Sequence, residues 1–169
     1  MKFLDQIMAV IISTANIPAE EQLKLSVDPV DEQLRCISQN VYHEARNEST
    51  AGMIAVVNVV LNRVDSSAFP NSACEVVYEG PHYKSTRTGN LYPYKHRCQF
   101  SWYCDGLSDE IKNIRKYKEI QKIVHVAVKA NIDVTDGATF YHADYVNPSW
   151  SQRLKKTTTI DRHIFYREK

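Results

Sequence analysis

The chain has 169 residues, of which 43% are hydrophobic and 24% are charged, so its length suits one globular domain with a core and is short for two. Its 21 basic residues are almost balanced by 20 acidic residues, for a formal net charge of +1. This balance gives no support for binding to nucleic-acid phosphates, and we expect no nucleic-acid partner.

Residues 1–30 are expected to form an N-terminal helical extension. An apolar run over residues 7–12 is far shorter than the roughly 20 residues of a membrane-spanning helix. Asp5 and Gln6 precede this run and interrupt what would be the apolar core of a signal peptide. We therefore expect one or two short helices and no stable membrane span, with Pro29 ending the segment.

A helix from about residue 31 to residue 47 carries the most informative residue of the chain, Glu44. Leu34, Ile37 and Val41 recur at helical spacing, and continuing their apolar stripe by three residues reaches Glu44. A carboxyl group on an apolar stripe is partly removed from water, which favours its neutral form and raises its pKa. A general acid needs a carboxyl group that stays protonated near neutral pH. An ordinary surface acid at a helix end is the alternative that this spacing leaves open.

A second helix is predicted over residues 51–64, with Ser49 or Thr50 as its cap. It is apolar almost all round, which is typical of a buried central helix. Asn58 and Asn62 lie four residues apart on one face of it. Because buried amides need hydrogen-bond partners, these two side chains are expected to hold a neighbouring loop or to line a cleft, and the structural role is favoured.

The segment over residues 79–106 is rich in Gly, Pro, Tyr and His, and a loop of this length in a compact domain is usually functional or disordered. Its aromatic content is not typical of disorder. Five tyrosines in and beside it suit stacking against flat ligands or sugar faces, although tyrosines in loops are also common packing residues. These tyrosines are Tyr78, Tyr83, Tyr92, Tyr94 and Tyr103.

The remainder of the chain is predicted to hold one further helix and a small β element. The helix covers about residues 109–131, and a turn follows at residues 135–137. Short strands are expected over residues 138–143, 157–160 and 163–167.

Four cysteines, Cys36, Cys74, Cys98 and Cys104, lack the paired C-x₂₋₄-C spacing of a structural zinc site. Their even number is compatible with two disulfides and an oxidising destination. Cys98 and Cys104 flank a short segment and are the favoured pair, while buried free thiols are the alternative.

Several common chemistries find no support in the sequence. His43 and Glu44 begin like the H-E-x-x-H zinc motif, but Asn47 stands where the second histidine is required. The other histidines are scattered singly, and neither a G-x-S-x-G motif nor a glycine-rich phosphate loop occurs. We therefore assign no metal ligand and no cofactor. What remains is a carboxyl acid on a helix that faces an aromatic-rich loop, which fits cleavage of a glycan.

A series of ordered blocks gives a more specific indication. The blocks are residues 41–48 (VYHEARNE), 52–64 (GMIAVVNVVLNRV), 69–70 (FP), 98–106 (CQFSWYCDG), 137–143 (GATFYHA), 148–150 (PSW) and 163–166 (HIFY). Together they resemble the spore cortex-lytic and cell wall hydrolase family over roughly Cys36 to Tyr166. The first block is similar to the glutamate-bearing E-A-R-G-E segment of that family, and block 98–106 looks most like its phage branch.

This resemblance implies an α+β, mainly helical, lysozyme-like catalytic domain over residues 31–169, with a small β element. It implies an enzyme that cleaves the glycan strands of peptidoglycan at N-acetylmuramic acid, with Glu44 as the catalytic acid. If the C6 hydroxyl of the sugar attacks, the enzyme is a lytic transglycosylase that forms a 1,6-anhydro end and needs no second carboxylate.

The resemblance also implies substrate-binding residues. Tyr141, His142 and Trp150 are expected near the acid, where they would orient it or stack on sugar. Trp102 is a further stacking candidate.

Simple hydrolysis would instead require a second carboxylate across the cleft. Glu48, Asp105 and Asp144 are the candidates. Glu48 also falls on the same side of the helix as Glu44, where its charge is expected to raise the pKa of Glu44 further.

One residue departs from the family pattern, because Asn47 stands where the family usually has Gly. Asn is the next most tolerant residue for a left-handed helix terminus, so we expect the fold to accept it. The chain leaves no room for the separate peptidoglycan-binding domain that the spore enzymes often carry, which favours an endolysin-like role in phage or prophage lysis. We expect a monomer that acts on the bacterial cell wall, with holin-dependent release as one export route.

Two alternatives from other classes stay open. One is a zinc-dependent N-acetylmuramoyl-L-alanine amidase, which chelators would inactivate. The other is a noncatalytic glycan-binding module, which would bind without turnover.

Overall fold

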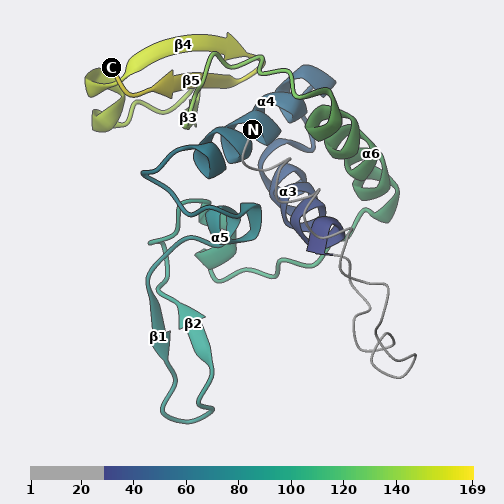
Figure 1. Ribbon diagram of the computed structural model, residues 1–169. Helices are drawn as coiled ribbons and strands as arrows, with labels where there is room; N and C mark the ends of the chain where they lie inside the picture. The colour runs from purple at the N-terminus through teal and green to yellow at the C-terminus, as the bar shows by residue number, and fades with distance from the viewer. Residues whose placement is uncertain (1–28) are drawn as a thin grey trace, which may run out of the picture.

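The computed structural model describes residues 29–169, and the extension expected over residues 1–30 lies almost wholly outside them. The fold is mainly helical with a small three-stranded sheet, as predicted, and it also has a two-stranded β1–β2 sheet that was not predicted (Figure 1). Its elements are α3 (Pro29–Ala45), α4 (Thr50–Asp65), α5 (Ala73–Val77), β1 (His82–Lys84), β2 (Leu91–Pro93), η1 (Ser101–Cys104), α6 (Ile114–Ala130), β3 (Phe140–Ala143), η2 (Ser149–Arg153), β4 (Lys155–Ile160) and β5 (His163–Arg167).

Helices α3, α4 and α6 pack against one another and enclose most of the apolar core. The predicted central helix is α4, and Val56, Val57 and Val60 on it are fully buried. The three-stranded sheet, in the order β3-β5-β4, lies on one side of the helices, and the β1–β2 hairpin projects in the opposite direction (Figure 1).

Several helix ends differ from the sequence prediction. Helix α3 begins at Pro29, which was expected to stop a preceding helix; proline suits a first helical position because its missing N–H has no partner there. Asn47 lies beyond the end of α3 and is not among the residues with positive φ, so the fold accepts Asn here, as expected, but without a left-handed terminus. Helix α6 begins at Ile114, five residues later than predicted, because the Asn113 side chain caps it.

The segment over residues 79–106 is an ordered unit in place of the predicted long loop. It forms the β1–β2 hairpin and then the 3₁₀ helix η1. Tyr83 pairs directly with Tyr92 across the hairpin. The preceding short helix α5, which the sequence analysis did not predict, is capped by Ser72.

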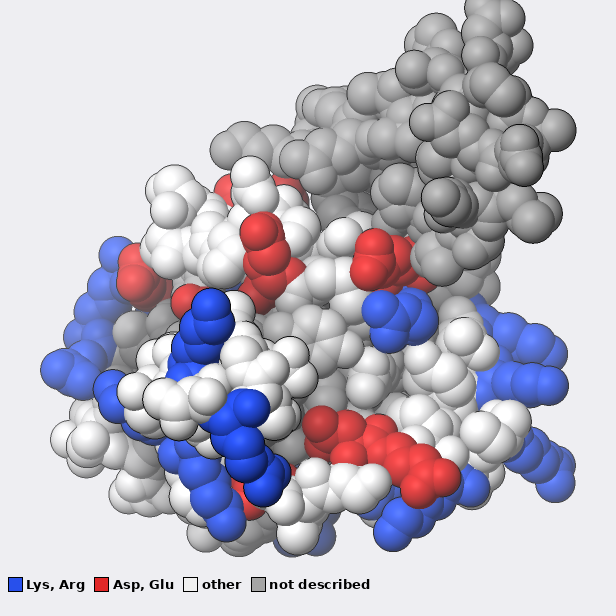
Figure 2. All heavy atoms as spheres, turned by 90° about the horizontal axis from the view of Figure 1, so that it is seen from below, with Lys and Arg blue, Asp and Glu red and all other residues white. Residues whose placement is uncertain are grey.

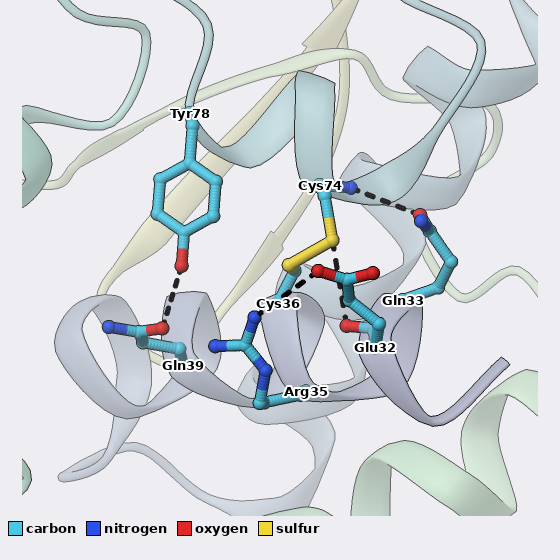
Figure 3. A network of polar contacts seen from close by, with 7 residues as sticks. All are labelled: Glu32, Gln33, Arg35, Cys36, Gln39, Cys74 and Tyr78. Atoms are coloured by element: carbon cyan, nitrogen blue, oxygen red, sulfur yellow. Dashed lines mark hydrogen bonds and ion pairs between the residues drawn. A yellow bond between two sulfur atoms is a disulfide. The ribbon is translucent and has the colours of Figure 1, made fainter. Parts of the chain in front are cut away.

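Two disulfides are present, and both shape this region. Cys98 pairs with Cys104, which confirms the predicted pair, and Cys36 pairs with Cys74. The second bond joins α3 to α5 (Figure 3). Beside it, the Gln33 side chain accepts a hydrogen bond of 3.1 Å from the Cys74 backbone N–H.

The asparagines of α4 hold the loop that leads into β3, in agreement with the structural role predicted for them. Asn58 donates to the carbonyl of Ile132 and accepts from the N–H of Val134, both at 3.0 Å. Asn62 donates to the carbonyl of Ala138, also at 3.0 Å. The start of β3 is therefore fixed relative to the central helix.

The turn between β4 and β5 is tied to the N-terminus of α4. The Asp161 carboxylate accepts hydrogen bonds from the backbone N–H and the hydroxyl of Ser49, at 2.9 and 2.6 Å. Ser49 in turn caps α4 by accepting from the N–H of Gly52. A Cβ atom on Gly52 would overlap the Asp161 carboxylate, so glycine is required for this close approach.

We expect Gly52→Ala to lower the free energy of unfolding by about 1–3 kcal/mol, the usual cost of overpacking, even though alanine favours a helix. A double-mutant cycle tests this cause: denaturant unfolding gives the free energies of unfolding of the wild type, Gly52→Ala, Asp161→Ala and the double variant. The alanine should cost less in the Asp161→Ala background, where the carboxylate is gone. Equal costs in both backgrounds would contradict the proposed steric cause.

Candidate active site

Glu44 lies in the last turn of α3, on the stripe that the sequence indicated. Ile37 and Val41 on this stripe are fully buried, and the Glu44 side chain keeps only part of its surface exposed. The carboxyl group is therefore largely desolvated yet still reachable from solvent.

Tyr141 on β3 is the polar partner of Glu44. Its hydroxyl donates a hydrogen bond of 2.8 Å to Glu44 Oε2. Burial and the neighbouring carboxyl raise the pKa of Tyr141 well above its usual value, so the hydroxyl keeps its proton and acts as a donor. The residues are 97 positions apart in sequence, and only the docking of the sheet on the helices brings them together.

Arg63 on α4 supplies a buried positive charge near this pair. Its side chain is 4% exposed, and its Nε donates a 2.8 Å hydrogen bond to the carbonyl of Thr139. Three phenylalanine rings, from Phe69, Phe100 and Phe140, surround the guanidinium at 5.0 to 5.9 Å from its Cζ atom. Arg63 was not among the site residues predicted from the sequence, although its position on the stripe of Val56, Val59 and Val60 indicated that it would be buried.

The pKa of Glu44 is raised, as the sequence predicted. Burial is the dominant cause, while the Tyr141 hydrogen bond and the Arg63 charge favour the carboxylate and partly oppose it. The expected contribution of Glu48 is wrong, because Glu48 is not among the groups that shift this pKa. The Glu48 carboxylate instead accepts a hydrogen bond of 3.4 Å from the Arg162 N–H.

Glu79 is a carboxylate near the site that the sequence analysis missed. Its negative charge favours the cationic form of Arg63, and its Oε2 is buried without a hydrogen-bond partner. It lines an open cavity of about 810 Å³ together with Phe69, Pro70, Asn71, Cys74, Glu75, Tyr78 and Gly80. The cavity thus begins beside the Arg63 cage, since Phe69 belongs to both.

His142 and Trp150 do not contact Glu44 in the described part of the chain. Because successive strand residues point to opposite faces, His142 lies on the other face of β3 from Tyr141. There its ring stacks on Tyr166 and meets the edge of Trp150. The structure therefore brings Tyr141 to the acid, whereas His142 packs with Trp150 of η2 against the other face of the sheet.

Trp102 occupies a different environment from the one expected. It is 7% exposed, its ring stacks on His43 at 4.4 Å, and its indole N–H donates to Asn40. A ring covered in this way offers little surface to a sugar, so Trp102 is a packing residue of the core.

The other acids suggested as second carboxylates have separate partners. Asp105 accepts a hydrogen bond from the N–H of Leu107, and Asp144 forms an ion pair of 3.6 Å with Arg162. Neither is among the groups that shift the pKa of Glu44.

Replacing Tyr141 with Phe should move the pH dependence of activity in a defined direction. In the native protein the Tyr141 hydrogen bond stabilises the Glu44 carboxylate. Without this bond, the pKa of Glu44 should rise further in Tyr141→Phe. Activity that needs protonated Glu44 falls as the pH passes that pKa, so the alkaline limb of the kcat/KM profile should shift to higher pH. An unchanged limb, or one displaced to lower pH, would contradict this role for Tyr141.

Two further findings concern residues 29–169 as a whole. Among them, no three His, Cys, Asp or Glu side chains are grouped as ligands for a metal ion. No helix within these residues is both long and apolar enough to cross a membrane.

Comparison with curated proteins identifies spore cortex-lytic enzymes as relatives. The enzyme of Halalkalibacterium halodurans is 26% identical over 136 residues, which cover 80% of this chain and 34% of that protein. The enzyme of Bacillus subtilis is 39% identical over 59 residues, which cover 35% of this chain and 19% of that protein. The chain therefore spans well under half the length of these relatives.

Solved structures show the same fold. The catalytic domain of SleB, a germination-specific lytic transglycosylase of Bacillus anthracis, superposes with a TM-score of 0.61 at 24% identity, covering 89% of this chain and all of that domain. The Bacillus cereus SleB catalytic domain gives a TM-score of 0.56 at 23% identity, covering 92% and 99% of the two chains. The predicted lysozyme-like, mainly helical fold class is thereby confirmed.

Most of the chain also matches one family. The match covers residues 47–166, beginning three residues after Glu44 and including α4, α6 and the three-stranded sheet. The resemblance inferred from the ordered sequence blocks is confirmed: the chain belongs to the cell wall hydrolase family.

Proposed function

We propose that this protein cleaves the glycan strands of peptidoglycan at N-acetylmuramic acid, as a lytic transglycosylase with Glu44 as its catalytic acid. The observation that carries the proposal is the buried Glu44 carboxyl, which has a raised pKa and accepts a 2.8 Å hydrogen bond from Tyr141. Burial keeps the carboxyl group protonated toward higher pH, while the hydrogen bond fixes its orientation.

The proposed reaction uses Glu44 twice. In the first step Glu44 gives its proton to the glycosidic oxygen, and the bond between that oxygen and C1 of N-acetylmuramic acid breaks. In the second step the Glu44 carboxylate takes the proton of the C6 hydroxyl while O6 bonds to C1, which closes the 1,6-anhydro ring. Glu44 ends protonated, and no water is consumed.

The charges around Glu44 suit both steps. Arg63 and Tyr141 each stabilise the carboxylate that exists between the steps, and burial makes its reprotonation favourable. None of the other acids considered as partners, Glu48, Asp105, Asp144 or Glu79, is among the groups that shift the pKa of Glu44. A single carboxyl that serves as acid and then as base fits this arrangement better than the two opposed carboxylates of hydrolysis.

Membership of the cell wall hydrolase family supports the substrate, and the names of the relatives support the reaction. We further propose that the protein acts as an endolysin-like monomer in phage-type bacteriolysis, outside the cytoplasm, with a holin as the candidate export route. The block 98–106, which resembles the phage branch, supports this role. Faster digestion of vegetative cell walls than of spore cortex would agree with it, and the reverse order would contradict it.

Mass spectrometry of the products from purified peptidoglycan tests the reaction. With EDTA present, anhydromuropeptides from the wild type would support the lytic transglycosylase. Reducing ends would mean hydrolysis and would direct attention to Glu79 as a second carboxylate. Free stem peptides that vanish on chelation would identify the zinc amidase, and binding without any product would identify the noncatalytic module.

A further inference from the structure

The β1–β2 hairpin and the segment that leads from it to Cys104 carry an unusual combination of side chains, and the two together are called the hairpin below. Between Gly80 and Cys104 the chain contains four Lys or Arg residues and not one Asp or Glu, although acids and bases are balanced over the whole chain. The four cations are exposed, and none forms an ion pair with an acid in residues 29–169. They are Lys84, Arg87, Lys95 and Arg97.

Three tyrosine rings share one face of the same hairpin. Tyr83 and Tyr92 are paired directly, and Tyr83 also lies 5.1 Å from Tyr94 between ring centroids. Each side chain keeps at least 40% of its surface exposed. The guanidinium of Arg97 lies 5.6 Å from the Tyr94 ring, so charge and aromatic surface meet on this face. Exposed aromatic clusters of this kind usually mark a binding surface.

A disulfide and backbone hydrogen bonds hold the base of the hairpin in place. The Cys98–Cys104 disulfide closes its base, where the N–H of Gln99 also donates to the carbonyl of Glu79 at 3.0 Å. The N–H of Tyr94 donates to the carbonyl of Pro81 at 2.9 Å. A surface held in this way loses little conformational freedom on binding.

The base of the hairpin adjoins the proposed active site. Gly80, where the hairpin leaves the domain, lines the same cavity as Glu79. Phe100, two residues after Cys98, lies against the Arg63 guanidinium, whose charge acts on Glu44. A polymer that lies in this cavity, beside the Arg63 cage, would therefore meet the base of the hairpin at Gly80. Lys and Arg side chains gather over the hairpin where it points toward the viewer (Figure 2).

We infer that the β1–β2 hairpin is a second substrate-binding surface, which holds peptide-bearing glycan beyond the cleaved bond. Its cations bind the carboxylates of the stem peptides, and its tyrosine face packs on the sugar rings between them. Charge complementarity selects this partner, because stem peptides carry several carboxylates each and the hairpin carries cations alone. The inference rests on the proposed function and extends it from the cleaved bond to the decorated polymer.

Cosedimentation with purified cell wall tests the inference. The wall is treated with hydrofluoric acid to remove teichoic acid, and every protein carries Glu44→Gln so that binding does not depend on cleavage. The variant Lys84→Gln/Arg87→Gln/Lys95→Gln/Arg97→Gln should bind roughly tenfold more weakly than its parent at low salt. The difference should vanish near 1 M salt, where exposed charges are screened.

Helix α6 offers a matched control. Arg115→Gln/Lys118→Gln/Lys122→Gln/Lys129→Gln removes the same charge from exposed positions of α6 and should bind like the parent. Equal weakening in both quadruple variants would show a general charge effect and overturn the inference. Unchanged binding by the hairpin variant would overturn it as well.

Glycan strands freed of stem peptides identify the anion. The hairpin variant and its parent should bind these strands equally, and a persisting difference would show that peptide carboxylates are not the partner. A difference seen only on wall that retains teichoic acid would assign the hairpin to phosphate, and would also overturn the inference. Cleavage is assayed separately with Glu44 intact, so absence of product would reject the proposed function without altering the binding result.

Discussion

Replacing Glu44 with Gln is expected to lower glycan cleavage by at least about a thousandfold, because the side chain loses its transferable proton. Gln keeps the size of the side chain, and its carbonyl oxygen can still accept the Tyr141 hydrogen bond. The loss should therefore fall on kcat, with little change in binding to the wall. Release of anhydromuropeptides, followed over time at saturating substrate, measures the effect.

The stability of the same variant provides the control. The pKa of Glu44 is raised in the folded protein, so its contribution to stability is present at low pH and is lost as the pH rises through the folded pKa. At neutral pH the neutral amide should therefore be as stable as the native carboxyl, or more stable. A Glu44→Gln protein that folds normally and still cleaves at the native rate would disprove the assignment of Glu44.

Loss of the Cys36–Cys74 disulfide is expected to lower the free energy of unfolding by about 4 kcal/mol. The bond joins residues 38 positions apart. Without it, the whole segment from Cys36 to Cys74 regains conformational freedom in the unfolded chain. Cys36→Ala/Cys74→Ala avoids burying a new polar group at the almost fully buried Cys36. Denaturant unfolding under non-reducing conditions gives the difference directly.

The second disulfide serves as the comparison for this prediction. Cys98 and Cys104 are only six positions apart, so Cys98→Ala/Cys104→Ala should cost about 2 kcal/mol. This disulfide, which encloses the shorter loop, closes the base of the hairpin. Its loss should therefore weaken binding to the wall, whereas loss of the Cys36–Cys74 disulfide should act mainly on stability. If both double variants lost the same stability, loop length would not be the governing factor.

Much of this fold could be read from local patterns. The stripe of Ile37, Val41 and Glu44 located the acid and predicted the direction of its pKa, because helical periodicity depends only on nearby residues. The apolar helix α4 and strand β5 were predicted with nearly correct bounds for the same reason.

Other features depend on contacts that no local pattern encodes. The hairpin in residues 79–106 has short strands with exposed side chains, so it lacks the alternation that marks a half-buried strand. Glu79 reaches the site only because α5 packs beside α4, and α5 has just five residues. Trp102 was a candidate for stacking on sugar, and no local pattern indicates that the His43 ring covers it.

The pairing of Glu44 with Tyr141 also means that the proposed site is completed late in folding. Contacts between residues 97 positions apart form after local helices, because the long intervening chain must first be ordered. During synthesis, α3 and its acid leave the ribosome long before β3 does, and the emerging chain holds Glu44 without the hydroxyl that orients it. A chain that ends before β3 therefore lacks the hydrogen bond that orients Glu44, and the proposed site is complete only once the last strands have joined the helices.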